Sequence, residues 1–269
     1  GSEIATRALQ DAMDKRPVLL KRDPALHKHS IQAFKPKIVE GRAISIHPLV
    51  CAGYNADFDG DTMSAFVPLS DDAVRESKRL FPSNNLFSST HGGIVYAPDQ
   101  EAIIGLHLLS KWGNQTTKKY ANYQEALAAY KDKREIKPTD VISVGGLKTT
   151  VGRLMIGERL PDAIKDTNFR KQLSDPKFAL TKHTPKDDTS RVGVLELLER
   201  VAKADPHAYA QTVDHLKDLG NHYSYETGFS FSLRDLDVNK KERDRILSPF
   251  NEEAEKVRKS NISQDKKNE

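Results

Sequence analysis

The segment Tyr54-Asn55-Ala56-Asp57-Phe58-Asp59-Gly60-Asp61 places three aspartates two positions apart. In an extended backbone, side chains two residues apart point to the same side, so this spacing predicts that the carboxylates of Asp57, Asp59 and Asp61 converge. Their hard oxygen atoms suit Mg²⁺, which completes its coordination shell with water and phosphate oxygens. Three like charges repel one another unless a cation lies between them. The octapeptide therefore predicts a magnesium site.

Two other structures bring acidic residues together over so short a distance. A calcium-binding EF-hand loop needs glycine at its sixth position and glutamate at its twelfth, but counting from Asp57 these positions hold Thr62 and Pro68. A solvated turn rich in Asp and Gly is the other alternative. The apolar stretches at 43–50 and 63–69 predict strands that hold the loop between them, which favours the magnesium site over a free turn.

Three further residues of this region carry structural expectations. Phe58, between two acids, is expected to be a buried anchor, and Gly60 to supply a backbone conformation that a Cβ atom would hinder. The single cysteine, Cys51, is expected to be a buried thiol in the strand before the loop, and it can form no disulfide within the chain. One cysteine is typical of a protein from a reducing, cytoplasmic setting.

Residues 55–61 also match the signature loop of the largest subunit of multisubunit DNA-dependent RNA polymerases, which is called β′ in bacteria. The resemblance is strong over residues 16–113 and moderate over 148–259. The stretches that carry it are 16–28, 31–36, 47–51, 82–86, 98–106, 149–153 and 227–230. The chain departs from the family pattern at Asp23, Gly53, Thr62 and 64–66.

The resemblance implies a catalytic subunit of a DNA-directed RNA polymerase, which transfers nucleotides from NTPs to the 3′ end of RNA. It implies that Asp57, Asp59 and Asp61 hold a permanent catalytic Mg²⁺, while a second Mg²⁺ arrives with the incoming NTP. It also implies that Arg22 and Asn55 contact the ribose, because both side chains can hydrogen-bond its 2′-hydroxyl.

The resemblance further implies partners: a β-like chain, the remaining β′-like segments, the DNA template and the RNA transcript. The sequence holds no match to the family's earlier barrel segment, bridge helix or trigger loop, so we expect the chain to be inactive by itself. Its altered positions favour a naturally split subunit, as in the polymerases of giant bacteriophages, over an excised fragment. The alternative is a polymerase-like interaction or regulatory protein without catalysis, which the three retained aspartates disfavour.

The composition is that of a soluble protein. The chain has 269 residues, of which 37% are hydrophobic and 30% charged, and its net charge of +4 is compatible with nucleic acid without establishing it. No stretch approaches the roughly 20 apolar residues that cross a bilayer, and no signal peptide is visible. We therefore expect a cytoplasmic location, in the bacterial host if the protein is viral, and no membrane partner.

The resemblance implies an α+β fold in which part of a double-psi β-barrel carries the loop and a mostly helical region follows. Closure of a barrel removes exposed strand edges, so an incomplete barrel is expected to need another chain at its free edge. The expected regions are an N-terminal helix at 1–15, the barrel portion at 16–113, a polar linker or insertion at 114–147, a mostly helical region resembling the border of the pore through which nucleotides enter at 148–259, and a flexible tail at 260–269.

Apolar periodicity predicts individual helices along the chain. The first four are expected at 3–14, 71–80, 100–111 and 123–131. In the last third, Thr189-Ser190 is expected to cap a helix that carries Val192 and Leu195, and Gly220 to end a second one. Ser248-Pro249 is expected to open a third helix, with Phe250, Ala254 and Val257 facing inward.

Overall fold

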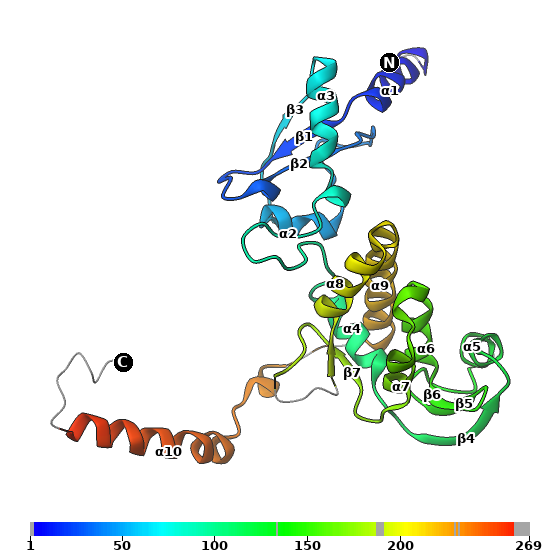
Figure 1. Cartoon of the computed structure of the whole chain (residues 1–269), viewed down its shortest axis with the longest axis vertical. Coiled ribbons are helices and arrows are strands. Elements are labelled where there is room, and N and C mark those ends of the chain that lie inside the picture. The colour runs from blue at the N-terminus through cyan, green and yellow to red at the C-terminus, as the bar shows by residue number, and fades with distance from the viewer. Residues whose placement is uncertain (1–2, 133, 187–190, 229, 231, 261–269) are drawn as a thin grey trace. The chain divides into compact units, whose positions relative to one another are not determined.

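The computed structural model describes residues 3–132, 134–186, 191–228, 230 and 232–260. The chain divides into two compact units, residues 1–227 and residues 228–269. Figure 1 labels most of the α-helices and strands of both units. Unit 1 contains three small sheets and most of the helices, whereas unit 2 contains a short 3-10 helix, η6 (Leu233–Leu236), and one long helix, α10 (Lys240–Lys259). The predicted α+β class is confirmed.

The first sheet supports the aspartate loop. Its central strand β1 (Val18–Lys21) pairs antiparallel with β2 (Ile31–Phe34) on one side and β3 (Ser64–Phe66) on the other. The helix α1 (Glu3–Lys15) precedes it and confirms the predicted N-terminal helix. The strands of the described residues form open sheets and no closed barrel, so the double-psi barrel remains an implication of the resemblance.

The segment before the loop is helical, and the strand predicted at 43–50 is wrong. A 3-10 turn, η2 (Pro48–Val50), begins there because the Nδ1 atom of His47 accepts a hydrogen bond from the backbone N–H of Leu49. It runs directly into the short helix α2 (Cys51–Tyr54), where Cys51 is half-buried. The prediction of a strand after the loop is confirmed by β3.

Helices predicted between residues 71 and 131 are confirmed, and their starts follow from capping side chains. Ser70 caps α3 (Asp71–Ser77), which continues into η3 (Lys78–Leu80). Asn122 caps α5 (Tyr123–Lys131) by accepting from the N–H of Glu125, and the Glu125 carboxylate accepts from the N–H of Ala121. The other elements of this stretch and of the segment before it are η1 (Lys28–Ser30), η4 (Pro82–Asn84) and α4 (Glu101–Ser110).

The polar stretch at 114–147 contains ordered elements in its described part. Strand β4 (Gln115–Tyr120) pairs parallel with β5 (Val141–Val144), which pairs antiparallel with β6 (Leu147–Thr150). Ala126 and Ala129 of α5 are buried. The stretch is therefore folded onto unit 1, and its identity as a family-variable insertion stays a prediction.

The rest of unit 1 is mostly helical, as predicted. Its elements are α6 (Val151–Glu158), η5 (Asp162–Ile164), α7 (Thr167–Ser174), the parallel strands β7 (Ala179–Thr181) and β8 (Arg191–Gly193), α8 (Val194–Ala204) and α9 (Pro206–Thr227). Helix α8 follows Gly193, and the cap predicted at Thr189-Ser190 lies outside the described residues.

Helix α9 continues through Gly220, so the predicted end there is wrong. The reason is packing: a Cβ atom on Gly220 would overlap the backbone of Ala102 in α4, and one on Gly105 of α4 would overlap the backbone of Gly220. The glycine allows two helix backbones to approach closely instead of terminating a helix. Helices α4 and α9 lie side by side in Figure 1.

The predicted helix start at Ser248-Pro249 is also wrong. Asn239 caps α10 by accepting from the N–H of Glu242, and Pro249 lies in the helix interior. Phe250 and Val257 were expected to face inward, but Phe250 is 66% exposed and no residue of this helix is buried. Within the described residues, no helix is both long and apolar enough to cross a membrane.

One continuous set of buried side chains connects the loop region with the helices. It includes Leu20 of β1 and Tyr54 at the end of α2, together with Leu106 of α4 and Leu216 of α9. The hydroxyl of Tyr54 donates to the backbone oxygen of Leu20 at 3.0 Å. The segment that leads into the aspartate loop is therefore held by the core of unit 1.

Candidate metal centre

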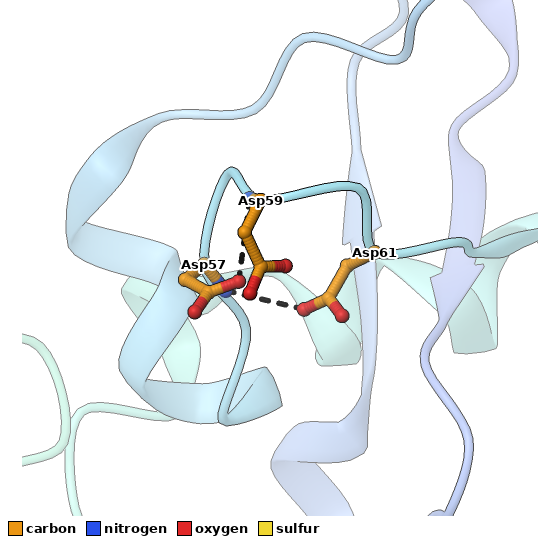
Figure 2. Close-up of side chains that lie close together, drawn as sticks. All are labelled: Asp57, Asp59 and Asp61. Carbon is orange, nitrogen blue, oxygen red and sulfur yellow. Dashed lines mark hydrogen bonds between the residues drawn. The ribbon is translucent and has the colours of Figure 1, made fainter.

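The three aspartates converge through a turn, and the extended backbone expected for them is not observed. Asn55 ends α2 in the left-handed conformation (φ 50°, ψ 45°), and Gly60 has φ 120°. The second value confirms the expected backbone role of Gly60, because side chains disfavour that region. Figure 2 shows the three carboxylates gathered within this turn. One ligand oxygen from each of Asp57, Asp59 and Asp61 lies within 4.8 Å of the others.

The loop closes on its own carboxylates. The backbone N–H of Asp57 donates to Asp61 Oδ2 at 3.2 Å, and the N–H of Asp59 donates to Asp57 Oδ1 at 3.4 Å. Phe58 contributes no anchor, because its side chain is 68% exposed; the prediction that it is buried is wrong. The shape of the loop comes from these backbone-to-carboxylate bonds and from the turn residues at its two ends.

Arg22 lies directly beside the aspartates. Its Nε and Nη2 atoms donate to the two carboxylate oxygens of Asp61 at 2.9 and 3.0 Å, and its Nη1 donates to the backbone oxygen of Tyr54 at 3.4 Å. The register of the sheet explains the contact: Lys21 of β1 pairs with Ser64 of β3, so the residues just beyond these strand ends come together. The structure thus unites four of the five predicted site residues in one contact network.

Two chemically identical side chains of the loop have opposite electrostatic environments. The hydrogen bond from Arg22 lowers the pKa of Asp61, and the backbone N–H of Asp57 acts in the same direction. The pKa of Asp59 is raised, first by its hydrogen bond with Asp57 and then by the negative charge of that residue. Arg22 therefore balances one carboxylate of the trio, and the repulsion between the other two favours a bound cation.

The donor set fits Mg²⁺. Neighbouring oxygens at about 2.0–2.1 Å from an octahedral ion stand roughly 3 Å apart, so the trio needs a contraction of up to about 2 Å to share one ion. All three aspartates are exposed, which leaves room for the water and phosphate oxygens that Mg²⁺ retains. Since Arg22 engages both oxygens of Asp61, binding requires this carboxylate to turn one oxygen toward the ion.

A cavity of about 510 Å³ opens beside Asp57. Asn55, the fifth predicted site residue, lines it together with residues that sequence reasoning did not find. They are Gln100 and Glu101 at the start of α4, and Lys217 and Asn221 on α9. Gln100 has a backbone conformation (φ 50°, ψ −124°) that is rare outside glycine, and residues in such conformations cluster at active sites and ligand clamps. Gln100 and Glu101 lie in the stretch 98–106 that carries the family resemblance, which was the one signal for them. Lys217 and Asn221 had no local signal, because tertiary packing brings them to the loop.

Comparison with known proteins identifies the family. Residues 3–82 match the family described as RNA polymerase Rpb1, domain 2, and residues 85–236 match RNA polymerase Rpb1, domain 3. The chain therefore belongs to the RNA polymerase Rpb1 family.

Its relatives include the DNA-directed RNA polymerase subunit beta' of a Nitratiruptor species, which is 36% identical over 243 residues that make up 87% of this chain and 15% of the relative. The corresponding subunit of a Thermoanaerobacter species is 35% identical over 93% of this chain and 22% of the relative. That of Campylobacter jejuni is 38% identical over 86% of this chain and 15% of the relative. The predicted resemblance to β′ is confirmed, and the chain spans about a fifth or less of the length of these relatives.

Proposed function

We propose that this chain supplies the magnesium-binding aspartates of a multisubunit DNA-directed RNA polymerase, in which they serve templated transfer of nucleotides from NTPs to the RNA 3′ end. The observation that carries the proposal is the convergence of Asp57, Asp59 and Asp61 within 4.8 Å in a chain of the Rpb1 family. The proposed partners are a β-like chain, the remaining β′-like segments, DNA and RNA, in the cytoplasm of a bacterium or of a phage-infected host.

The residues of the loop would hold and orient the metal ion. Bound Mg²⁺ would supply Lewis-acid chemistry at the RNA 3′-hydroxyl and at the α-phosphate of the NTP, and a second ion would come with the triphosphate. Asp57, Asp59 and Asp61 would hold the permanent ion through one oxygen each. Arg22 keeps Asp61 ionised, since its hydrogen bond lowers the pKa of that carboxyl, and the charged carboxylate can then turn one oxygen toward the metal.

Arg22 and Asn55 are proposed to contact the ribose of the substrate. Arg22 has its Nη1 atom 3.4 Å from the Tyr54 backbone oxygen, a long contact that a stronger acceptor could replace, and Asn55 lines the cavity beside Asp57. Lysine lacks the planar fork of arginine and cannot hold Asp61 and a hydroxyl in the same way. Arg22→Lys should therefore weaken the preference for NTP over dNTP roughly tenfold, a loss that corresponds to one charge-assisted hydrogen bond.

The test is RNA extension from a primed template by the chain assembled with its candidate partners. Asp59→Ala should abolish magnesium-dependent extension. Asp72→Ala should leave it unchanged, because Asp72 is an exposed residue of α3 that forms an ion pair with Arg75 and lies outside the aspartate loop. Extension that survives Asp59→Ala would refute the catalytic role and favour a polymerase-like regulatory protein. Extension by the chain without partners would refute its role as a subunit.

A further inference from the structure

His47 uses both nitrogens of its imidazole ring, and the two contact different parts of unit 1. The Nδ1 atom accepts the backbone N–H of Leu49 at 3.2 Å and starts the turn η2, which leads through α2 into the aspartate loop. The Nε2 atom lies 3.1 Å from Oδ1 of Asp214 on α9. One side chain therefore joins the start of the loop-bearing segment to the helical part of the unit.

The first of these contacts determines the tautomer of the ring. Because Nδ1 accepts a hydrogen bond, the proton of the neutral imidazole lies on Nε2, where it is donated to Asp214. Lys217 Nζ is 3.3 Å from the same Nε2 atom, but both atoms are donors in this tautomer. The Asp214 carboxylate is therefore the group that holds His47 and Lys217 together.

The α9 side of the link is firmly placed. Lys217 Nζ donates to Asp214 Oδ1 at 2.8 Å and lies 3.0 Å from Asp218 Oδ1, and only 14% of its side chain is exposed. One turn further along α9, the close approach of Gly220 to α4 sets the position of the helix. His47 thus attaches a short, partly exposed segment to a helix that belongs to the core.

We propose that His47 is a positioning residue for the aspartate loop: through Asp214 it holds the η2–α2 segment against α9, and so keeps Asp57 placed for a shared metal ion. The inference rests on the proposed metal site. At the other end of the loop, Asp61 is held by Arg22. The ion must draw oxygens from both ends together, so looseness at the His47 end lowers metal affinity even when every ligand is present.

Two substitutions separate the functions of the two ring nitrogens. In His47→Asn, the side-chain oxygen can replace Nδ1 as the cap of η2, but the shorter side chain cannot reach Asp214. In His47→Gln, the amide nitrogen can replace Nε2 as the donor to Asp214, but the cap is lost. The probe is Mn²⁺ binding to the full chain, measured by the electron paramagnetic resonance signal of the free ion.

We expect His47→Asn to weaken Mn²⁺ binding about threefold, because a pair whose side chains are each 45% exposed contributes only modestly. His47→Gln should bind Mn²⁺ with the affinity of the unaltered protein, because its amide can still donate to Asp214. If His47 acted only as the cap of η2, His47→Gln would lose affinity instead. Wild-type affinity in His47→Asn, or an equal loss in both variants, would overturn the proposal. Thermal melting of each variant confirms that the affinities compare folded proteins.

Substitution of Asp214 provides a second, independent test of the link. Asp214→Ala should reproduce the loss seen in His47→Asn, and the double variant should lose no more than either single one, because both remove the same link. Asp218→Ala is the matched control, since it removes a partner of Lys217 but does not touch His47; its affinity should be unchanged. Additive losses in the double variant, or an equal loss in Asp218→Ala, would contradict the proposed link.

The reference variant is Asp59→Asn. If it weakens Mn²⁺ binding and His47→Asn does not, the metal site stands and the role of His47 is refuted. If Asp59→Asn leaves Mn²⁺ binding unchanged, the aspartate loop is not the metal site, and both this inference and the proposed function fail.

Discussion

At the scale of single residues, neighbouring groups decide what a charged side chain does. Asp59 and Asp61 are chemically identical and lie two positions apart, yet the pKa of one is raised by Asp57 and that of the other is lowered by Arg22. The same contrast separates Arg22, at the exposed loop, from Arg153, which is fully buried in α6. The sequence shows which residues are charged, but only their neighbours in the structure show what each charge does.

Arg153 organises the interior of unit 1 without an acidic partner at hydrogen-bond distance among the described residues. It donates to the backbone oxygens of Ser110, Leu173, Asp175 and Phe178 at 2.6 to 3.1 Å, and its guanidinium stands over the rings of Trp112 and Phe178. Burial lowers its pKa to about 10, which leaves it charged at neutral pH. A single planar cation thereby binds four backbone carbonyl groups, three of them buried.

Arg153→Lys should lower the free energy of unfolding by about 3 kcal/mol. The three N–H donors of the lysine ammonium cannot reproduce the planar arrangement of the guanidinium, so buried carbonyl groups are left unpaired. Urea denaturation measures the change. Arg159→Lys is the matched control, since Arg159 donates to one backbone oxygen, that of Met155, and its effect should stay below about 1 kcal/mol. Equal effects of the two substitutions would contradict the role assigned to Arg153.

The link between Asp214 and Lys217 should make stability weakly dependent on pH. The hydrogen bond from Lys217 lowers the pKa of Asp214 in the folded state, so its stabilisation is complete above the pKa of an unfolded aspartate. The stabilisation is lost as the pH falls through the lower, folded value. Asp214 is 45% exposed, so we expect no more than about 0.5 kcal/mol. Urea denaturation at several pH values measures the free energy of unfolding of the unaltered protein and of Asp214→Asn. The difference between the two free energies should disappear at acidic pH. A difference that grows at acidic pH would contradict the assignment.

At the scale of elements, the crossing of α4 and α9 shows how packing overrides local preference. Gly105 and Gly220 lie at the point where the two backbones approach, and a Cβ atom on either would overlap the other helix. Helix propensity alone favours alanine over glycine by about 1 kcal/mol at such interior positions. The close crossing reverses that preference, and it places Lys217 and Asn221 of α9 beside the aspartate loop.

Gly220→Ala should destabilise the protein by about 2 kcal/mol through overpacking, despite the gain in helix propensity. Gly157→Ala in α6 is the matched control, because a Cβ atom there would make only ordinary contacts, at 3.6 Å from Leu173 and 3.7 Å from Phe169. That change should be neutral or stabilising by up to about 1 kcal/mol. Thermal unfolding of both variants checks the prediction, and a Gly220→Ala protein as stable as the original would refute the close crossing.

At the scale of the whole molecule, the two units differ in how they are stabilised. The buried core belongs to residues 1–227, whereas α10 buries none of its side chains and exposes the apolar residues Ile246, Leu247 and Phe250. A helix with no buried face gains little from tertiary packing, which is the main source of helix stability in proteins. Unit 1 should therefore hold nearly all of the cooperative stability of the chain.

Limited trypsin digestion should cut first within unit 2, at exposed basic residues such as Arg234 and Lys240. The product that retains unit 1 should melt within a few degrees of the intact chain, because the removed segment contributes no buried core. Mass spectrometry identifies the cut, and calorimetry compares the melting temperatures. An early cut inside unit 1, or a large fall in melting temperature after removal of unit 2, would contradict this division.

The sequence by itself determined the aspartate loop, its three carboxylates, the special backbone conformation of Gly60 and the family to which the chain belongs, together with helices such as α5. These features depend on residues a few positions apart, where backbone geometry, capping and apolar spacing act locally. Only the structure showed that η2 and α2 precede the loop in place of a strand, although the cap on His47 that starts η2 is local. Tertiary packing decided that Phe58 is exposed and that Gly220 lies inside a helix.

The tertiary structure also decided which distant residues lie next to the site. The pairing of Lys21 with Ser64 brings Arg22 to Asp61, and the crossing of α9 over α4 brings Asp214 to His47. These residues stand 39 and 167 positions apart in the chain. No local periodicity extends so far, because strand register and helix packing are set by the complementary surfaces of segments that meet only after the chain has folded.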